Sequence, residues 1–171
     1  MSSFTEKNEY VPEMQQNIEL LKEIPFFSAL PVKVLKLIAF VAVRGSCSSG
    51  DLLYEEGDGP NRAYLVLNGS LVLIIRGTYG EKTVIQRFTE GDFFGSLSLF
   101  GFMPALFDLV AETKTTVLTI DRTQFSKILT QFPEIQAITL KAIFKKIHRW
   151  ERTNISEAAP CCSKRIGVTA L

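Results

Sequence analysis

The spacing of hydrophobic residues divides the chain into three zones, and the first, to about residue 40, is predicted to be helical. Met14, Ile18 and Leu21 recur at intervals of four and three residues, which places them on one helical face. Pro12 suits the first helical position, and Pro25 should end this helix because proline disfavours the helical conformation in the residue before it. A second short helix follows Pro31, and its apolar side is formed by Val34, Leu35 and Ile38.

The middle zone, about residues 42–120, consists of short apolar runs separated by glycines, which predicts β-strands. Asn68–Gly69 lies between two such runs, residues 64–67 and 71–75. This dipeptide predicts a two-residue hairpin, because a type I′ turn needs a positive φ at both central positions. A second turn is expected at residues 76–81. Many short strands at regular spacing predict a sandwich or barrel such as a jelly roll.

The last zone, from Asp121, is again predicted to be helical. Asp121 can accept hydrogen bonds from the free amides at the start of a short helix that reaches about Leu129. A longer helix is expected from about Glu134 to Arg152, after the helix-breaking pair Phe132–Pro133.

One domain is expected at residues 12–152, since a chain of 171 residues can bury a core of its own. Within it, the β zone covers about residues 42–120 and the C-terminal helices about residues 121–152. Residues 1–11 and 153–171 are expected to be flexible termini.

Composition and charge exclude several classes of protein. The net charge is +1, so no overall field favours binding to nucleic acid or to an anionic membrane. No apolar run is long enough to span a bilayer, and the N-terminal residues do not form a signal peptide. Three cysteines cannot make a disulfide framework, and one histidine cannot supply a metal site, which predicts a cytoplasmic protein without bound metal.

Five short motifs follow one another in the chain: PFFSAL, GD, EGD, YLVLNG and GDFFG, at residues 25–30, 50–51, 56–58, 64–69 and 91–95. Their order, together with the order of helices and strands, resembles the cyclic nucleotide-binding domains of catabolite activator protein and protein kinase A regulatory subunits. The resemblance implies an α+β, mainly β fold. That fold is a β-roll, or double-stranded jelly roll, flanked by N-terminal helices and a long C-terminal helix.

The phosphate-binding cassette of that family has the form G-x-x-F-G-E-x-A-L-L, followed by P-R-x-A. The resemblance places Ser96 where the family has the glutamate that holds a ribose hydroxyl, and Ala105 where it has the arginine that holds the cyclic phosphate. Two lost hydrogen bonds to charged groups would cost on the order of 3–6 kcal/mol, or about 10²–10⁴ in affinity. We therefore expect no tightly bound cofactor, with cAMP or cGMP bound weakly if at all. The implied ligand-binding residues are Phe94, Gly95, Ser96, Leu97, Ser98, Ala105 and Leu106.

Two interpretations of this cassette stay open, because it is unusually apolar. Either the pocket accepts an apolar or less charged ligand, or side chains fill it and the domain is a packed scaffold. The apolar residues in question are Leu97, Leu99, Phe100, Phe102, Met103, Leu106 and Phe107.

The long C-terminal helix also has two interpretations. Four apolar residues spaced three, four and three apart form the stripe of a two-helix contact, which predicts a dimer or partner interface, or a helix packed on its own roll. Its basic side is either a solvated face or a contact for an acidic partner. The apolar stripe is Leu140, Ile143, Ile147 and Trp150, and the basic side is Lys141, Lys145, Lys146, Arg149 and Arg152.

The leading hypothesis is a stand-alone, non-catalytic regulatory module that acts through contacts with a protein partner or a second copy. The alternative is a genuine sensor that binds a cyclic nucleotide or another small ligand at an altered cassette. No catalytic residues are expected, since no nucleophile lies beside a base. The 19 residues after Arg152 are too few for a helix-turn-helix, so we expect no DNA binding, and no membrane contact is expected.

Overall fold

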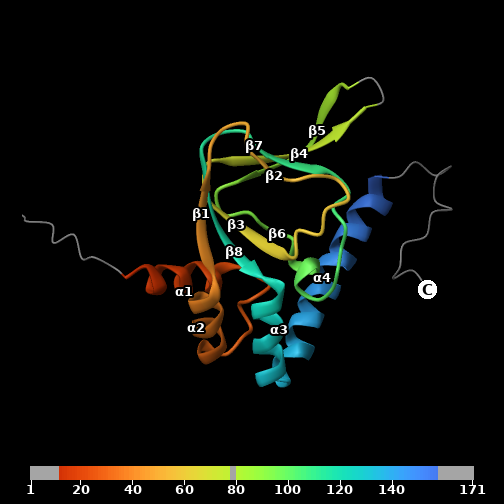
Figure 1. Ribbon diagram of the computed structural model, residues 1–171. Helices are drawn as coiled ribbons and strands as arrows, with labels where there is room; N and C mark the ends of the chain where they lie inside the picture. The colour runs from red at the N-terminus through yellow and green to blue at the C-terminus, as the bar shows by residue number, and fades with distance from the viewer. Residues whose placement is uncertain (1–11, 78–79, 158–171) are drawn as a thin grey trace, which may run out of the picture.

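The computed structural model describes residues 12–77 and 80–157. Within them, two four-stranded antiparallel sheets face each other (Figure 1). The strand orders are β1-β8-β3-β6 and β2-β7-β4-β5. This arrangement confirms the predicted α+β, mainly β roll. The strands are β1 Val43–Cys47, β2 Leu52–Tyr54, β3 Arg62–Asn68, β4 Ser70–Arg76, β5 Lys82–Thr89, β6 Phe93–Phe94, β7 Asp108–Ala111 and β8 Thr115–Asp121.

Helices gather at one end of the roll, and the last of them continues along its side (Figure 1). Asp121 caps α3 as predicted, because its carboxylate accepts hydrogen bonds from the amides of Thr123 and Gln124 at 2.8 and 3.3 Å. The helices are α1 Glu13–Glu23, α2 Val32–Val41, the 3-10 turn η1 Ser96–Leu99, α3 Arg122–Gln131 and α4 Glu134–Glu157.

The helix limits differ from the predicted ones in two places. Pro12 precedes the first helical residue of α1, and α4 continues past the expected end at Arg152 to Glu157. On the predicted stripe of α1, Ile18 and Leu21 are buried, but Met14 is 42% exposed because it lies in the first turn, at the end of α1 farthest from the roll (Figure 1). The expected flexibility of residues 1–11 and 153–171 concerns residues that lie largely outside the described part of the chain. The division into an N-terminus (1–11), one domain (12–152) and a tail (153–171) stays a prediction.

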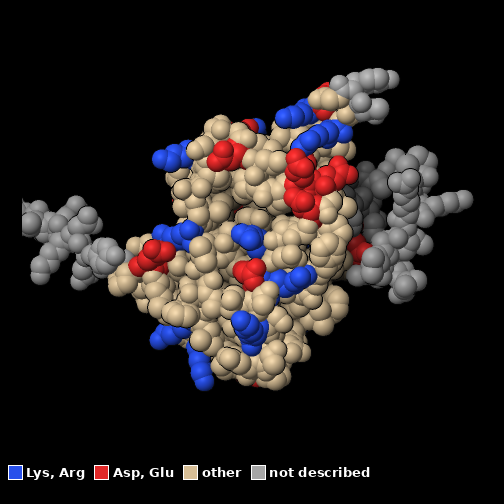
Figure 2. Space-filling model, in the orientation of Figure 1, with Lys and Arg blue, Asp and Glu red and all other residues tan. Residues whose placement is uncertain are grey.

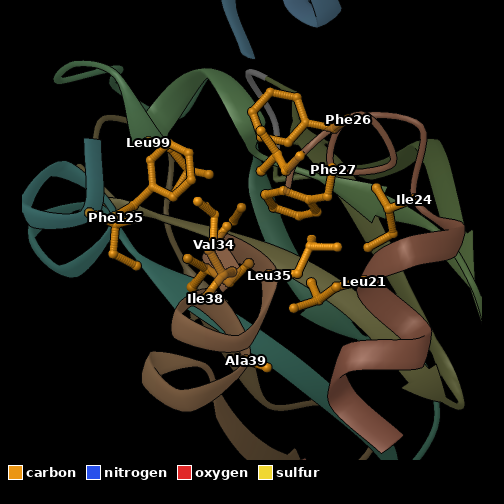
Figure 3. Packing of buried hydrophobic residues seen from close by; sticks show 14 of the residues in the cluster. Leu21, Ile24, Phe26, Phe27, Val34, Leu35, Ile38, Ala39, Leu99 and Phe125 are labelled. Atoms are coloured by element: carbon orange, nitrogen blue, oxygen red, sulfur yellow. The ribbon is translucent and has the colours of Figure 1, made fainter. Parts of the chain in front are cut away.

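The first hydrophobic core lies between the helices and the sheet that contains β3 and β8. Phe27 is fully buried at the centre of this core. The centroid of its ring lies 4.7 Å from that of Phe26, 5.2 Å from that of Phe93 and 6.5 Å from that of Phe125. Figure 3 shows Phe26, Phe27 and Phe125 around the apolar side of α2. That side is formed by Val34, Leu35 and Ile38, as predicted.

A second core fills the space between the two sheets. Strand β3 serves both cores, because side chains alternate between its two faces. Ala63 and Leu65 belong to the first core, whereas Tyr64 and Val66 belong to the second. Both faces of β3 are thus buried, which explains why its apolar run is continuous and does not alternate with polar residues.

The hairpin predicted at Asn68–Gly69 is wrong. Strands β3 and β4 flank this dipeptide, but they belong to different sheets and do not pair with each other. Gly69 has a φ of +86°, and a Cβ there would lie 2.4 Å from the carbonyl oxygen of Lys114. The glycine is thus needed for a crossover between the sheets, packed tightly against the start of β8.

The second predicted turn is confirmed as the connection of the β4–β5 hairpin. The amide of Gly77 donates to the carbonyl of Glu81 at 2.8 Å, and β4 pairs with β5 along its length. None of the helices in the described residues is both long and apolar enough to cross a membrane.

Candidate functional site

Gly95 sets the geometry of the predicted cassette. It has a φ of +75°, in the left-handed region, and a Cβ there would lie 2.9 Å from the carbonyl oxygen of Arg62. Only glycine therefore allows the chain to turn from β6 into η1 so close to β3. The carbonyl of Gly95 accepts a hydrogen bond from the amide of Ser98 at 3.0 Å, which closes the first turn of η1. The first amides of such a turn have no hydrogen-bond partner within the turn itself.

The structure places the cassette residues from Phe94 to Ser98 at the end of β6 and the start of η1, with alternating exposure. Phe94 is held between two rings, with centroid distances of 3.9 Å to Phe88 and 5.3 Å to Tyr64. Ser96 and Ser98 are buried, whereas Leu97 is exposed. The two hydroxyls thus lie on the protein side of the turn.

Ala105 and Leu106 lie on the loop before β7, and their backbone is tied to a different turn. The amide of Ala105 donates to the carbonyl of Asp58 at 2.7 Å, and the amide of Gly57 donates to the carbonyl of Ala105 at 2.8 Å. Leu106 is 74% exposed. At the position of the family's arginine, this loop therefore presents a methyl group beside an exposed leucine.

A buried carboxylate follows on β7, and the sequence does not reveal its partners. Asp108 is 4% exposed and accepts a hydrogen bond from the amide of Glu56 at 2.9 Å. It also pairs with the guanidinium of Arg76, which reaches Glu55 at 3.2 Å. The hydrogen bond from Glu56, followed by the contact with Arg76, lowers the pKa of Asp108 and holds it ionised.

Arginines outside the cassette could in principle replace the missing one, but two of them are already paired. Arg76 faces Asp108 and Glu55, and the Nε of Arg87 donates to Glu112 at 2.7 Å. The partner of Arg76 becomes predictable only when β4 and β7 are known to be neighbours, because 32 residues separate the two side chains in the chain.

The C-terminal stripe is divided by the structure. Ile143 is buried in the first core and Ile147 packs against it, whereas Leu140 is 45% exposed. The side chain of Trp150 lies outside the described residues. One part of the stripe thus packs on its own roll, while Leu140 is left on the surface together with Phe144.

Charge and metal-ligating side chains define no further centre. Figure 2 shows acidic and basic groups interspersed on one face, with an acidic group gathered below the β4–β5 hairpin. In residues 12–77 and 80–157, no three histidine, cysteine or acidic side chains are grouped as metal ligands would be. Burial raises the pKa of the Cys47 thiol, which makes it a poor nucleophile.

The profile of the cyclic nucleotide-binding domain matches residues 44–132, a little more than half of the chain. This chain therefore belongs to the cyclic nucleotide-binding domain family. Its relatives include regulators and sensors, and the match covers the β-roll together with α3.

Curated relatives resemble this chain over one part of their length. A lysophospholipase nte1 from Aspergillus oryzae is 28% identical over 130 residues, which make up 76% of this chain and 8% of the fungal protein. The cAMP-dependent protein kinase regulatory subunit of Schizosaccharomyces pombe is 28% identical over 110 residues, 64% of this chain and 26% of that protein. The chain thus spans only a small fraction of these relatives.

Solved structures share the fold. A cyclic nucleotide-binding-like protein from Brucella abortus is 29% identical, with a TM-score of 0.61 over 67% of this chain and 98% of that one. The N-terminal domain of a transcriptional regulator from Streptomyces coelicolor A3(2) is 24% identical, with a TM-score of 0.69 over 84% of this chain and 98% of the other. The second likeness concerns the fold alone.

Proposed function

We propose that this chain is a non-catalytic regulatory module of the cyclic nucleotide-binding family that acts through protein contacts. Its cassette binds cAMP or cGMP weakly or not at all. The observation that carries this proposal is that Ala105 lies at the position that the resemblance gives to the family's arginine, while Arg76 is held by Asp108 and Glu55. A cyclic phosphate at the cassette would lack the cation that pairs with it in the family, which disfavours its binding.

The internal partners of Asp108 support this reading. Arg76 neutralises Asp108 and also contacts Glu55, so its charge is already used within the protein. Moving Arg76 to a ligand would leave the Asp108 carboxylate without its partner, and a buried charge without a partner is costly. The module would then act through protein contacts made by α4, where the exposed Leu140 lies beside the basic side chains of the helix.

Thermal unfolding of the 171-residue chain with millimolar cAMP and cGMP tests this proposal. A ligand at 100 times its dissociation constant adds about 2.7 kcal/mol to the free energy of unfolding. For a protein of this size, the midpoint should then rise by roughly 5–10 °C. We expect no shift of that size with either nucleotide. A shift would reject the proposal in favour of the sensor.

The alternative function is a sensor for an apolar or weakly charged ligand. The exposed side chains of the cassette favour it, since Leu97, Phe102 and Leu106 offer apolar surface to a ligand. A nucleoside without a phosphate would not need the missing cation. Calorimetry with adenosine and guanosine beside the cyclic nucleotides distinguishes this function, because it requires that the nucleoside bind more tightly.

A further inference from the structure

A groove separates α4 from the connection between α1 and α2, and none of the implied ligand-binding residues of the cassette lines it. Its volume is about 840 Å³, within the range of small-molecule sites. One wall is formed by residues between Leu20 and Ala29, and the opposite wall by α4. Leu65 and Phe93, from β3 and β6, close its floor.

The groove changes character along α4. Ile138 and Ala142 line its first part, opposite the apolar side chains of Leu20 and Ile24. Lys145, Lys146 and Arg149 line its second part. At 1.5 Å per residue, the distance along the helix from residue 138 to residue 149 is about 16 Å. Lys141 also lines the first part, between Ile138 and Ala142, whereas every lining residue of α4 past Ala142 is basic. The cationic side chains are therefore concentrated toward one end of the groove.

The lysines of this groove make no ion pair within the described part of the chain. No carboxylate there lies within ion-pairing distance of Lys141, Lys145 or Lys146, and Glu23 is the one acidic residue of the lining. Desolvation lowers the pKa of Lys146, although its side chain stays exposed at the edge of the groove. An anion placed beside this ammonium group would stabilise its charged form through an ion pair.

We propose that this groove binds a single-chain amphiphile with an anionic head, a carboxylate or a phosphate. The tail lies between Ile138, Ala142 and the apolar residues of the α1–α2 connection, and the head contacts Lys145 and Lys146. The polarity of the groove favours this occupant over an acidic helix of a partner. Such a helix would need cations along its whole length, whereas these cations are concentrated toward one end.

This site borders the cassette at Gly91 and Phe93 but shares none of its implied ligand-binding residues, so it does not depend on the function proposed above. The test uses a dansyl-labelled undecanoic acid as a fluorescent probe, with the full chain, below the critical micelle concentration. We expect saturable binding of one probe per chain, displaced by dodecanoate and by dodecyl phosphate. Dodecanol, which has the tail without the charge, should compete at least about tenfold less well. Equal competition by dodecanol would overturn the proposal, and so would displacement by cAMP.

Two variants locate the site. The double change Lys145→Glu and Lys146→Glu should weaken probe binding about tenfold or more. The control, Lys36→Glu with Lys114→Glu, makes the same change in net charge at exposed positions outside the groove and should bind as the original chain does. Ala142→Phe should block the tail by filling the groove, with circular dichroism to check folding. Unchanged binding in both groove variants would overturn the proposal.

A membrane surface is the other source of such a head group. Co-sedimentation with vesicles of phosphatidylcholine and phosphatidylglycerol distinguishes it from a free amphiphile. The proposal expects no retention by vesicles under conditions in which the monomeric probe binds. Retention by vesicles without binding of monomeric probe would replace the amphiphile site with a membrane-binding face.

Discussion

Restoring the two missing family contacts should create cyclic nucleotide binding if the cassette still has room for the ligand. The double variant Ser96→Glu and Ala105→Arg adds one acceptor for the ribose hydroxyl and one cation for the phosphate. Each hydrogen bond to a charged group contributes roughly 1.5–3 kcal/mol, so the two together should contribute about 3–6 kcal/mol. This corresponds to a gain in affinity of about 10²–10⁴-fold.

The structure predicts that the double variant will fall short of that gain. Ser96 is buried, so a glutamate at this position must displace its neighbours. The carboxylate of Asp108 would also compete with the phosphate for the new arginine. Adding Asp108→Asn removes this charge and keeps an oxygen that can accept the hydrogen bond from the amide of Glu56. The triple variant should therefore bind cAMP more tightly than the double variant.

Calorimetric titration with cAMP measures the affinities of the original chain and both variants. A matched control, Ser126→Glu with Ala137→Arg, makes the same two kinds of change at exposed positions on α3 and α4, and it should leave cAMP binding unchanged. If the folded triple variant shows no gain over the original chain, the missing contacts do not explain weak binding. The cassette would then be filled, or the alignment of Ala105 with the family's arginine would be wrong.

Three further predictions concern the stability of the roll and are measured by denaturation. Phe27→Ala should lower the free energy of unfolding by about 3–5 kcal/mol, because it empties the centre of the first core. Gly69→Ala should destabilise more than Gly91→Ala in urea unfolding, since both glycines have positive φ but only Gly69 is packed against backbone. Equal effects would argue against the tight crossover. Because the folded-state pKa of Asp108 is lowered, its stabilising contribution is present above its unfolded pKa of about 4 and is lost as the pH falls through the folded pKa. The thermal midpoint should fall with pH below about 4, and less steeply in Asp108→Asn.

The sequence predicts the order of the elements well because that order depends on local signals. The cap at Asp121 and the turn at residues 76–81 depend on residues close to each other in the chain, and both are confirmed. Strand pairing depends instead on which faces are buried. Asn68–Gly69 carries the local signal of a hairpin, but β3 pairs with β8 and β6, and the chain crosses to the other sheet. A turn signal does not specify the sheet that follows it.

The candidate site shows the same division between local and distant information. Residues 94–98 run from the end of β6 into η1, so their proximity follows from the motif itself. The pairing of Arg76 with Asp108 joins two strands far apart in the chain, and only the neighbouring positions of β4 and β7 reveal it. The groove likewise lies between α4 and the connection between α1 and α2, which are far apart in the chain. The basic residues of α4 can be seen in the sequence, but the apolar wall that faces them cannot.

The turn at residues 55–58 bears on whether this module needs a ligand to become ordered. The carboxylate of Asp108 accepts a hydrogen bond from the amide of Glu56, and the backbone of Ala105 bonds to Gly57 and Asp58. The protein thus holds this turn against β7 and its preceding loop with its own groups. A ligand shifts a conformational equilibrium only by its difference in affinity for the two states. Since this turn is already held in place, a ligand at the cassette would have little to order here. This is the behaviour expected of a regulatory scaffold rather than a nucleotide switch.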